Sequence, residues 1–183
     1  MGAVAQEQLL EREDELAALE ELVEGARGGE GRLVVLEGAA GIGKTRLLQA
    51  ARALARPRGL RVLTARGTEL ERDFPFALVR QLLEPALHGV EPSEQDDLLA
   101  GAVRPAAPVV GVEPGDGETS APGGLADPSF ATLNALYWLT SNLAESAPTL
   151  LAVDDAHWSD KPSLRFFRDI ERRSELPQAL EAK

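Results

Sequence analysis

Eight consecutive residues combine glycines, a lysine and a threonine at a spacing that suits phosphate binding. They are Gly38-Ala39-Ala40-Gly41-Ile42-Gly43-Lys44-Thr45. Glycines let the backbone curl so that successive N–H groups point inward at phosphate oxygens. The Lys44 ammonium would reach the β- and γ-phosphates, and the Thr45 hydroxyl would occupy one coordination site of Mg²⁺. The stretch therefore predicts a nucleotide-binding loop.

The flanking sequence predicts the strand and the helix that such a loop joins. Leu33-Val34-Val35-Leu36 is a short apolar run typical of a fully buried parallel strand. After the loop, apolar residues recur at helical spacing, namely Leu47, Leu48, Ala51, Leu54 and Ala55. The N-terminus of that helix would add partial positive charge near the phosphates. Strand, glycine loop and helix in this order are typical of a P-loop, or Walker A motif.

A second acidic element lies far downstream, where the apolar run 149–153 ends in Asp154 and Asp155. Ligands of an open parallel sheet bind beyond the carboxyl ends of its strands. We assign Asp154 to Mg²⁺ and Asp155 to orienting or deprotonating the attacking water, with Lys44 as the second catalytic residue. An acidic helix cap would give the same local pattern, so this assignment depends on the presence of the glycine loop upstream. The predicted nucleotide contacts of the loop are Gly38, Gly41, Ile42, Gly43, Lys44, Thr45 and Arg46.

Composition limits the remaining functions. The chain has 183 residues, a net charge of −11 and no cysteine. A chain with this negative charge is not expected to bind DNA or an anionic membrane through a broadly basic surface. Without cysteine there is no disulfide or thiolate metal site. No apolar run long enough to span a membrane and no secretory signal is visible, so we expect a cytoplasmic protein.

The other predicted elements alternate along the chain. Helices are expected over 11–26, 76–88, 93–103 and 128–145, with Ser93 as a cap, and a second strand is expected over 60–65. Residues 105–128 are rich in proline and glycine, so we expect a mobile loop there. Phe130, Tyr137 and Trp138 are expected in the core rather than as a base-stacking platform. The alternation indicates a three-layer α/β/α fold with a parallel sheet.

Several segments together resemble a known family. Val153-Asp154-Asp155-Ala156-His157-Trp158-Ser159-Asp160 is similar to the Walker B segment of the Orc1-like AAA ATPase module of large LuxR-type transcription regulators, which are signal-transduction ATPases. The stretch from Leu9 to Leu16 resembles the box that precedes the P-loop there, and Phe74-Pro75-Phe76 and Leu136-Tyr137-Trp138-Leu139 also resemble that module. The likeness covers essentially the whole chain.

The resemblance implies further roles. Arg12 would contact the nucleotide, although a solvated charge at a helix start explains it equally well. His157 and Trp158 would line the γ-phosphate side and relay nucleotide state, or would belong to a capping loop that packs on the sheet edge. One arginine of α-helical residues 165–173 could act as an arginine finger, although a solvated helix face is the stronger reading. These arginines are Arg165, Arg168, Arg172 and Arg173.

The family's sheet has five strands in the order 5-1-4-3-2, and this chain would supply the first three. We expect a single P-loop ATPase domain over residues 1–183 that stops before the fourth, sensor-bearing strand and is therefore incomplete at its C-terminus. A fragment of a longer protein explains this better than a truncated product. Robust hydrolysis by 183 residues alone is not expected.

The leading functional hypothesis is an ATP-binding, slowly hydrolysing signalling module of a LuxR-type regulator, with nucleotide state as the switch. The expected cofactors are ATP and Mg²⁺, and GTP is disfavoured because no guanine-specific motif occurs. Its partners would be regulatory and DNA-binding domains of the longer protein, with nucleotide-dependent self-association possible and no direct nucleic-acid contact. The alternatives are a non-hydrolysing, nucleotide-gated interaction module and a small-molecule P-loop kinase.

Overall fold

Two parallel strands form the centre of the fold in a computed structural model that describes residues 12–112 and 128–174. The strands are β1 (Arg61–Arg66) and β2 (Thr149–Asp154). The α-helices are α1 (Glu13–Arg27), α2 (Lys44–Ala55), α3 (Ala77–His88), α4 (Pro92–Leu98), α5 (Pro128–Ser146) and α6 (Lys161–Ser174). Short 3-10 helices are η1 (Arg56–Arg58), η2 (Glu69–Glu71), η3 (Gly101–Ala106) and η4 (Ala156–Trp158). The described chain is thus mixed α/β and mostly helical.

The register of the two strands brings their carboxyl ends together. Arg61 lies opposite Thr149 at one end of the pair, and Arg66 lies opposite Asp154 at the other. Because the strands are parallel, the loops that leave Arg66 and Asp154 emerge at the same edge of the sheet. The predicted acidic pair therefore lies beside the end of the other strand, and the expectation of a parallel sheet is confirmed for these two strands.

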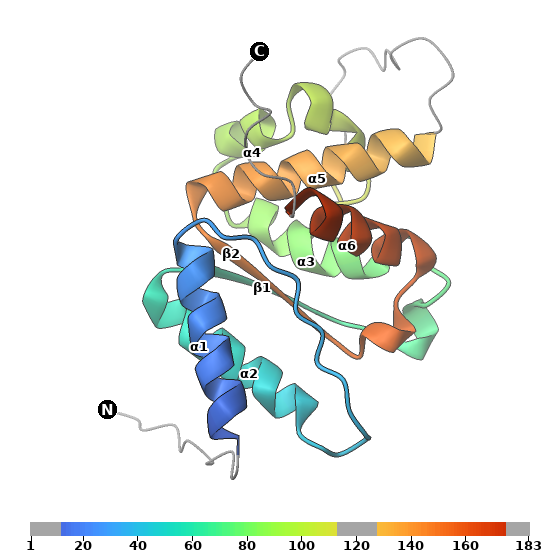
Figure 1. Cartoon of the computed structure of the whole chain (residues 1–183). Helices are drawn as coiled ribbons and strands as arrows, with labels where there is room; N and C mark the ends of the chain where they lie inside the picture. The colour runs from blue at the N-terminus through green and yellow to red at the C-terminus, as the bar shows by residue number, and fades with distance from the viewer. Residues whose placement is uncertain (1–11, 113–127, 175–183) are drawn as a thin grey trace.

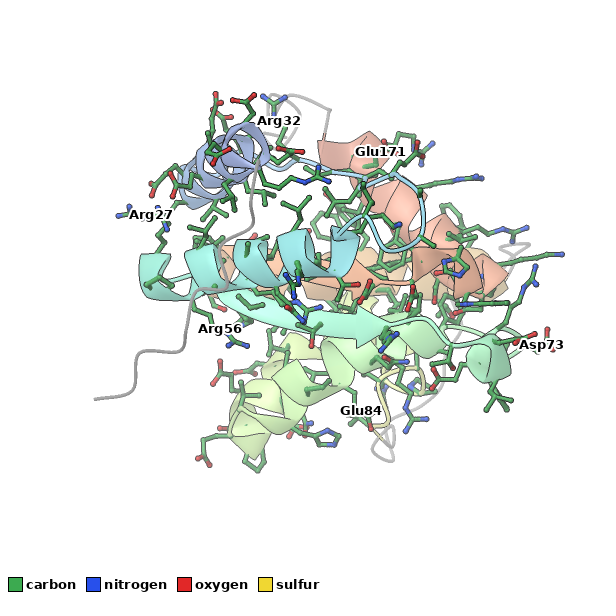
Figure 2. All side chains as sticks on the ribbon, turned by 90° about the horizontal axis from the view of Figure 1, so that it is seen from below. Arg27, Arg32, Arg56, Asp73, Glu84 and Glu171 are labelled. Atoms are coloured by element: carbon green, nitrogen blue, oxygen red, sulfur yellow. The ribbon has the colours of Figure 1, made fainter. Side chains whose placement is uncertain are left out.

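Helices cover both faces of this sheet (Figure 1). On one face, Leu150 of β2 packs with residues of α1 and α2, including Leu19, Leu47 and Ala51. On the other face, Leu63 of β1 joins the largest core cluster, which α3, α5 and α6 build. Alternate strand residues point to opposite faces, which explains why neighbouring strand positions belong to different clusters. Figure 2 shows the same layers with labelled charged side chains at their periphery.

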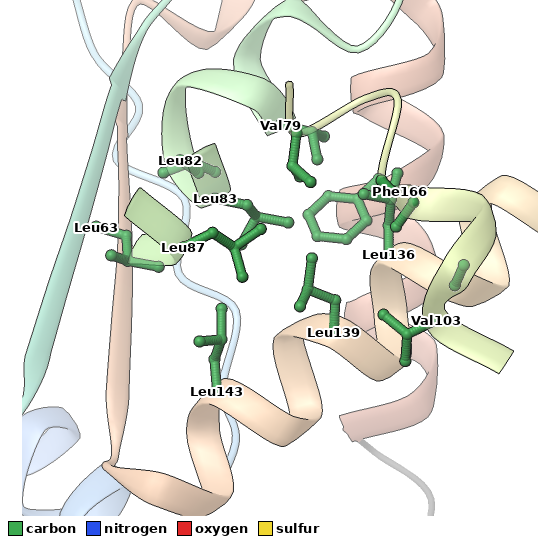
Figure 3. Close-up of a cluster of buried hydrophobic side chains, with 14 of the residues drawn as sticks. Leu63, Val79, Leu82, Leu83, Leu87, Val103, Leu136, Leu139, Leu143 and Phe166 are labelled. Carbon is green, nitrogen blue, oxygen red and sulfur yellow. The ribbon is translucent and has the colours of Figure 1, made fainter. Parts of the chain in front are cut away.

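The largest cluster explains why α3, α5 and α6 form and pack. Its apolar residues recur every three or four positions, so each helix has one buried stripe. Phe166 of α6 is fully buried and lies among leucines of α3 and α5 (Figure 3). The fully or almost fully buried leucines there are Leu78, Leu82, Leu83, Leu87, Leu136, Leu139 and Leu143. Within residues 12–112 and 128–174, no helix has the length and apolar character needed to cross a bilayer.

The predicted strand at Leu33–Leu36 is wrong. These residues belong to no strand, and the exposed fractions of Leu33, Val34 and Val35 are 47%, 46% and 67%. Only Leu36 packs inward, against the cluster beneath α1 and α2. A buried strand needs a neighbour for its N–H and C=O groups, and the described residues place none beside this segment. The described sheet therefore has two strands rather than three.

The predicted helix over 93–103 is also wrong in its extent. Helix α4 ends at Leu98, the chain turns over residues 99–100, and Gly101, the first residue of the 3-10 helix η3, has a φ of 57°. Ser93 lies inside the first turn of α4 rather than at its cap, which is Glu91. Left-handed backbone at Gly101 interrupts α-helical hydrogen bonding, which the sequence pattern alone did not indicate.

The expected mobile loop at 105–128 needs a correction at its start. Ala106, Ala107 and Val110 are 0%, 3% and 0% exposed, so the first residues of this segment pack in the core. Their small apolar side chains pack in one cluster with residues of α5. The high proline and glycine content of the segment did not indicate this packing. The remainder, residues 113–127, lies outside the described residues.

The aromatic side chains of α5 do not form the core that the sequence predicted. Phe130 is 61% exposed and Trp138 is 37% exposed, while Tyr137 is half-buried. The buried stripe of α5 consists instead of small and aliphatic residues, namely Ala135, Leu136, Leu139 and Leu143. At 100° per residue, Phe130 lies on the side of α5 opposite this stripe, and Trp138 lies well away from its centre.

Candidate nucleotide-binding site

The glycine loop adopts backbone conformations that only glycine accommodates without strain. Gly41 and Gly43 have φ values of 79° and 99°. A Cβ at either position would meet nothing within 4 Å, so the constraint is conformational rather than steric. Gly43 is the N-cap of α2, and among the described residues no side chain caps this helix. The first N–H groups of α2 are thus available at the loop, as anion binding requires.

Lys44 folds back over the loop that precedes it. Its Nζ donates hydrogen bonds to the carbonyl oxygens of Gly38 at 2.8 Å and Ala39 at 2.9 Å. These bonds hold the ammonium against the start of the loop, and Lys44 is itself the first residue of α2. A positive charge and the helix N-terminus therefore act on the same small volume.

Thr45 connects the loop to β2. Its hydroxyl donates to the carboxylate of Asp154, at 3.2 Å from Oδ1 and 3.1 Å from Oδ2. The two residues are 109 positions apart in the sequence, so this contact is the direct link between the glycine loop and the acidic pair. A hydroxyl and a carboxylate are hard oxygen donors of the kind that Mg²⁺ prefers. The fold brings together the two residues predicted as metal ligands.

Asp155 turns away from this pair. Its backbone has φ 50° and ψ 42°, a left-handed conformation that is uncommon for a residue other than glycine. Its N–H donates to Asp154 Oδ1 at 3.0 Å, which fixes the turn. Its carboxylate accepts a hydrogen bond from the Arg66 Nε at 3.0 Å from Oδ2, and Nη2 of the same guanidinium forms an ion pair with Oδ2 at 2.9 Å. Strained backbone of this kind concentrates at functional sites.

Arg66 was not among the residues that the sequence predicted for the site. It ends β1, and its side chain reaches Asp155 because the strand register places Arg66 opposite Asp154. The expected strand 60–65 stops one residue before it. A charged residue directly after an apolar strand, in a fold with a second such strand end, is the signal that could have found it.

Gly67 allows the two strand ends to approach so closely. Its N–H donates to the carbonyl of Asp154 at 2.9 Å, which extends the sheet by one bond. A Cβ placed on Gly67 would lie 2.4 Å from the carbonyl oxygen of Asp155 and 3.1 Å from Cβ of Trp158. Glycine is required here because another backbone occupies the space of a side chain.

A buried carboxylate secures the segment that follows. Asp160 is 2% exposed and accepts hydrogen bonds from the Phe76 N–H at 2.8 Å, the Ser163 N–H at 2.8 Å and the Ser163 hydroxyl at 2.6 Å. It therefore caps α6 and ties this helix to the loop before α3. Sequence reasoning missed this role, although Asp-x-x-Ser before an amphipathic helix is a capping pattern.

Arg12 lies at the glycine loop. Its Nη2 donates to the carbonyl of Ile42 at 3.0 Å, and its Nη1 pairs with Glu15. The hydrogen bond from Arg12 holds the pKa of the Glu15 carboxyl below its ordinary value. Ile42 and Arg46 are exposed on the loop and on the first turn of α2. The structure thus places Arg12 against the predicted nucleotide loop.

His157 and Trp158 follow Asp155 in the 3-10 helix η4. Their ring centroids are 5.0 Å apart, His157 is exposed, and Trp158 is half-buried beside Gly67. The pair therefore lies at the carboxyl ends of the strands, next to the acidic residues.

The arginines of α6 lie on the other face of the sheet from α2. With Phe130 and Leu133 of α5 they line a groove of about 300 Å³. Arg173 is held by Asp169 at 3.0 Å, by Asn134 at 3.1 Å and by the Tyr137 ring at 4.2 Å. Within one chain these arginines do not reach the glycine loop.

A family model of the AAA ATPase domain matches residues 8–180. The chain belongs to the AAA ATPase domain family. Membership implies a P-loop fold, which agrees with the strand ends, the glycine loop and the helix described above. No curated protein and no solved structure matches the chain significantly. In this AAA ATPase domain the roles of individual residues stay predictions.

Proposed function

We propose that this AAA ATPase domain is an ATP-binding, slowly ATP-hydrolysing signalling module whose nucleotide state acts as a switch in a LuxR-type transcription regulator. The observation that carries the ATPase part is the hydrogen bond between Thr45 and Asp154, because it joins the glycine loop to the acidic strand end. The regulator part is supported by the resemblance of the segment from Val153 to Asp160.

The loop fits the phosphate chain of ATP. The left-handed glycines at 41 and 43 leave open space where side chains would stand, and α2 begins there with its N–H groups exposed to a ligand. Lys44 would exchange its bonds with Gly38 and Ala39 for bonds with the β- and γ-phosphates. Gly38, Ile42 and Arg46 would complete the contacts of the loop, and Arg12 would border the nucleotide beside Ile42.

Thr45 and Asp154 fit a magnesium ion. Mg²⁺ in nucleotide sites takes one or two protein oxygens and completes its shell with phosphates and water. The described residues contain no group of three or more histidine, cysteine or acidic side chains placed to hold a metal ion together, and such a group is not needed for this kind of site. When bound, the ion neutralises charge that develops on the transferring phosphate.

Asp155 would act on the attacking water. Asp155 directly follows the proposed metal ligand Asp154, and its backbone N–H donates to Asp154 Oδ1. Its carboxylate is held by the Arg66 guanidinium. From that position it would accept a proton from the water or hold the water in line. The pairing of Asp155 with Arg66 also suits the alternative, a module that binds nucleotide without hydrolysing it.

Phosphate release by the full-length protein separates the two functions. We expect Asp155→Asn to lower the rate by about 100-fold, because a positioned general base contributes about that much. Asp96→Asn removes an exposed carboxylate of α4 and serves as the matched control. An unchanged rate in Asp155→Asn would support the non-hydrolysing module instead.

The regulatory role has its own test. The proposed partners are regulatory and DNA-binding domains of a longer protein, and nucleotide-dependent self-association is part of the proposal. Light scattering of the full-length protein with ATP and with ADP should give different masses or shapes. Identical behaviour in both nucleotides would argue against a switch while leaving ATP binding untouched.

A further inference from the structure

Helix α6 carries a stripe of arginines on its outer face. The helix has five basic and two acidic residues, a net charge of +3 in a chain whose net charge is −11. Arg165, Arg168 and Arg172 are exposed and recur every three or four positions, so they lie on one face of the helix. Like charges at this spacing slightly destabilise a helix, so the stability of α6 gives no reason for the stripe.

The stripe borders the groove of about 300 Å³ between α5 and α6, two helices that pack against each other (Figure 1). Phe130 and Leu133 of α5 supply the apolar part of its lining. Phe130 is 61% exposed, although α5 buries Leu136 and Leu139 completely. Exposed aromatic side chains and arginines are the residues that protein–protein interfaces favour.

The arginines that line the groove differ in their partners. Asp169 holds two of them, because its Oδ1 lies 2.9 Å from Nη2 of Arg172 and its Oδ2 lies 3.0 Å from Nε of Arg173. Arg165 and Arg168 form no hydrogen bond or ion pair with any residue that the structure describes. Two guanidinium groups beside an apolar lining are therefore available to carboxylates from another molecule.

We propose that the groove between α5 and α6 binds an acidic amphipathic helix of a partner protein. The partner helix would place a large apolar side chain against Phe130 and Leu133. Carboxylates three or four positions apart on that helix would pair with Arg165 and Arg168, which are three positions apart on α6. The groove lies on the other face of the sheet from α2, so this binding goes beyond the proposed ATPase function and leaves the glycine loop open.

Charge and apolar lining together favour such a helix over a nucleic acid. The net charge of −11 repels a long polyanion, whereas a short acidic helix brings few charges together with an apolar anchor. Helix α1 of a second copy is acidic but fits less well. Its Leu19 and Val23 are buried against the rest of its own chain, and its exposed apolar residues are Ala17 and Ala18.

Fluorescence anisotropy with a labelled synthetic peptide tests the proposal on the full-length protein. The probe is a helix of about 18 residues with leucines at every third or fourth position and glutamates beside them. We expect saturable binding that Arg168→Glu weakens at least about tenfold, because it turns an attraction into a repulsion. Phe130→Ala should weaken it by a similar factor, since an aromatic anchor is lost. Arg56→Glu, on an exposed arginine of η1, is the matched control and should change the Kd less than about twofold.

Two altered peptides and one stability measurement complete the experiment. Replacing all glutamates of the probe with glutamine, or all leucines with serine, should each weaken binding at least about tenfold. Thermal unfolding of Arg168→Glu and Phe130→Ala should match that of the natural protein, because both side chains are exposed. Weaker binding then reports on the groove rather than on misfolding.

Four results would overturn the proposal. The first is that the natural protein does not bind the probe below about 1 mM. The second is equal binding by the natural protein, Arg168→Glu and Phe130→Ala. The third is a single-stranded oligonucleotide whose binding requires Arg168 while peptide binding does not, which would identify a nucleic-acid surface. The fourth is a homo-oligomer, seen by analytical ultracentrifugation, that Arg168→Glu dissociates, because the groove would then be an interface between copies. None of these results depends on ATP hydrolysis, so the proposed function stands or fails separately.

Discussion

Replacing Gly67 with alanine tests how closely the two strand ends must approach. The new Cβ would lie 2.4 Å from the carbonyl oxygen of Asp155, whereas ordinary contacts begin at 3.4 Å. The backbone of Asp155 or of residue 67 must therefore move by about 1 Å, the difference between 3.4 and 2.4 Å. The obstacle is backbone rather than the end of a flexible side chain, so it has no alternative rotamer.

This displacement should affect both the free energy of unfolding and the rate of phosphate release. Overpacking of this kind typically costs about 1–3 kcal/mol, and we expect the free energy of unfolding to fall by that amount. A displacement of about 1 Å at a catalytic carboxylate lowers rates by up to about 100-fold. Gly67→Ala should therefore slow phosphate release more than its loss of stability alone would explain.

Chemical denaturation and phosphate release measure the two effects separately. Gly89→Ala is the control, because Gly89 ends α3 with φ −88° and a Cβ there would meet its nearest atom at an ordinary 3.4 Å. We expect that variant to stay within about 0.5 kcal/mol of the natural protein. If Gly67→Ala matched Gly89→Ala in both assays, the close approach of the strand ends would be refuted.

Two further predictions concern the supports of the site. Asp160→Ala should lower the free energy of unfolding by about 2–4 kcal/mol, since α6 loses its cap and the part-buried Phe76 N–H loses its acceptor. Asp160→Asn keeps an acceptor oxygen and should cost less, and equal denaturation midpoints for both variants would contradict this. Because Arg12 lowers the pKa of Glu15, their pairing is complete above the ordinary pKa of glutamate and is lost as the pH falls through the lowered value. Arg12→Gln should raise the pKa of Glu15 toward its ordinary value in an NMR titration, and an unmoved pKa would show that another group lowers it.

Local patterns predicted most helices and both strands of this domain. Leu47 and Ala51 mark the buried stripe of α2, and the apolar run before Asp154 is β2. The sequence also assigned Thr45 and Asp154 to one magnesium ion, and these two side chains are in hydrogen-bond contact. The rule for parallel strands does not explain this contact, because residues 33–36 form no strand; helix α2, which begins at Lys44, instead packs against β2.

The remaining features depend on neighbours that a local pattern does not contain. Val35 is apolar enough for a strand, but a strand also needs a paired backbone beside it. Val110 packs in the core although prolines and glycines surround it in sequence. Arg66 lies at the site because of the register of β1 and β2, and Gln81 lies beside it because α3 packs on β1. A local sequence pattern contains neither the register nor the packing.

Titration calorimetry of the full-length protein with ATP, with and without Mg²⁺, tests the central claim most directly. The account predicts magnesium-dependent ATP binding that Lys44→Ala weakens strongly and whose magnesium dependence is lost when Asp154→Asn is combined with Thr45→Val. ATP binding that ignores magnesium, or that survives all three substitutions unchanged, would contradict a site built where the glycine loop meets the end of β2.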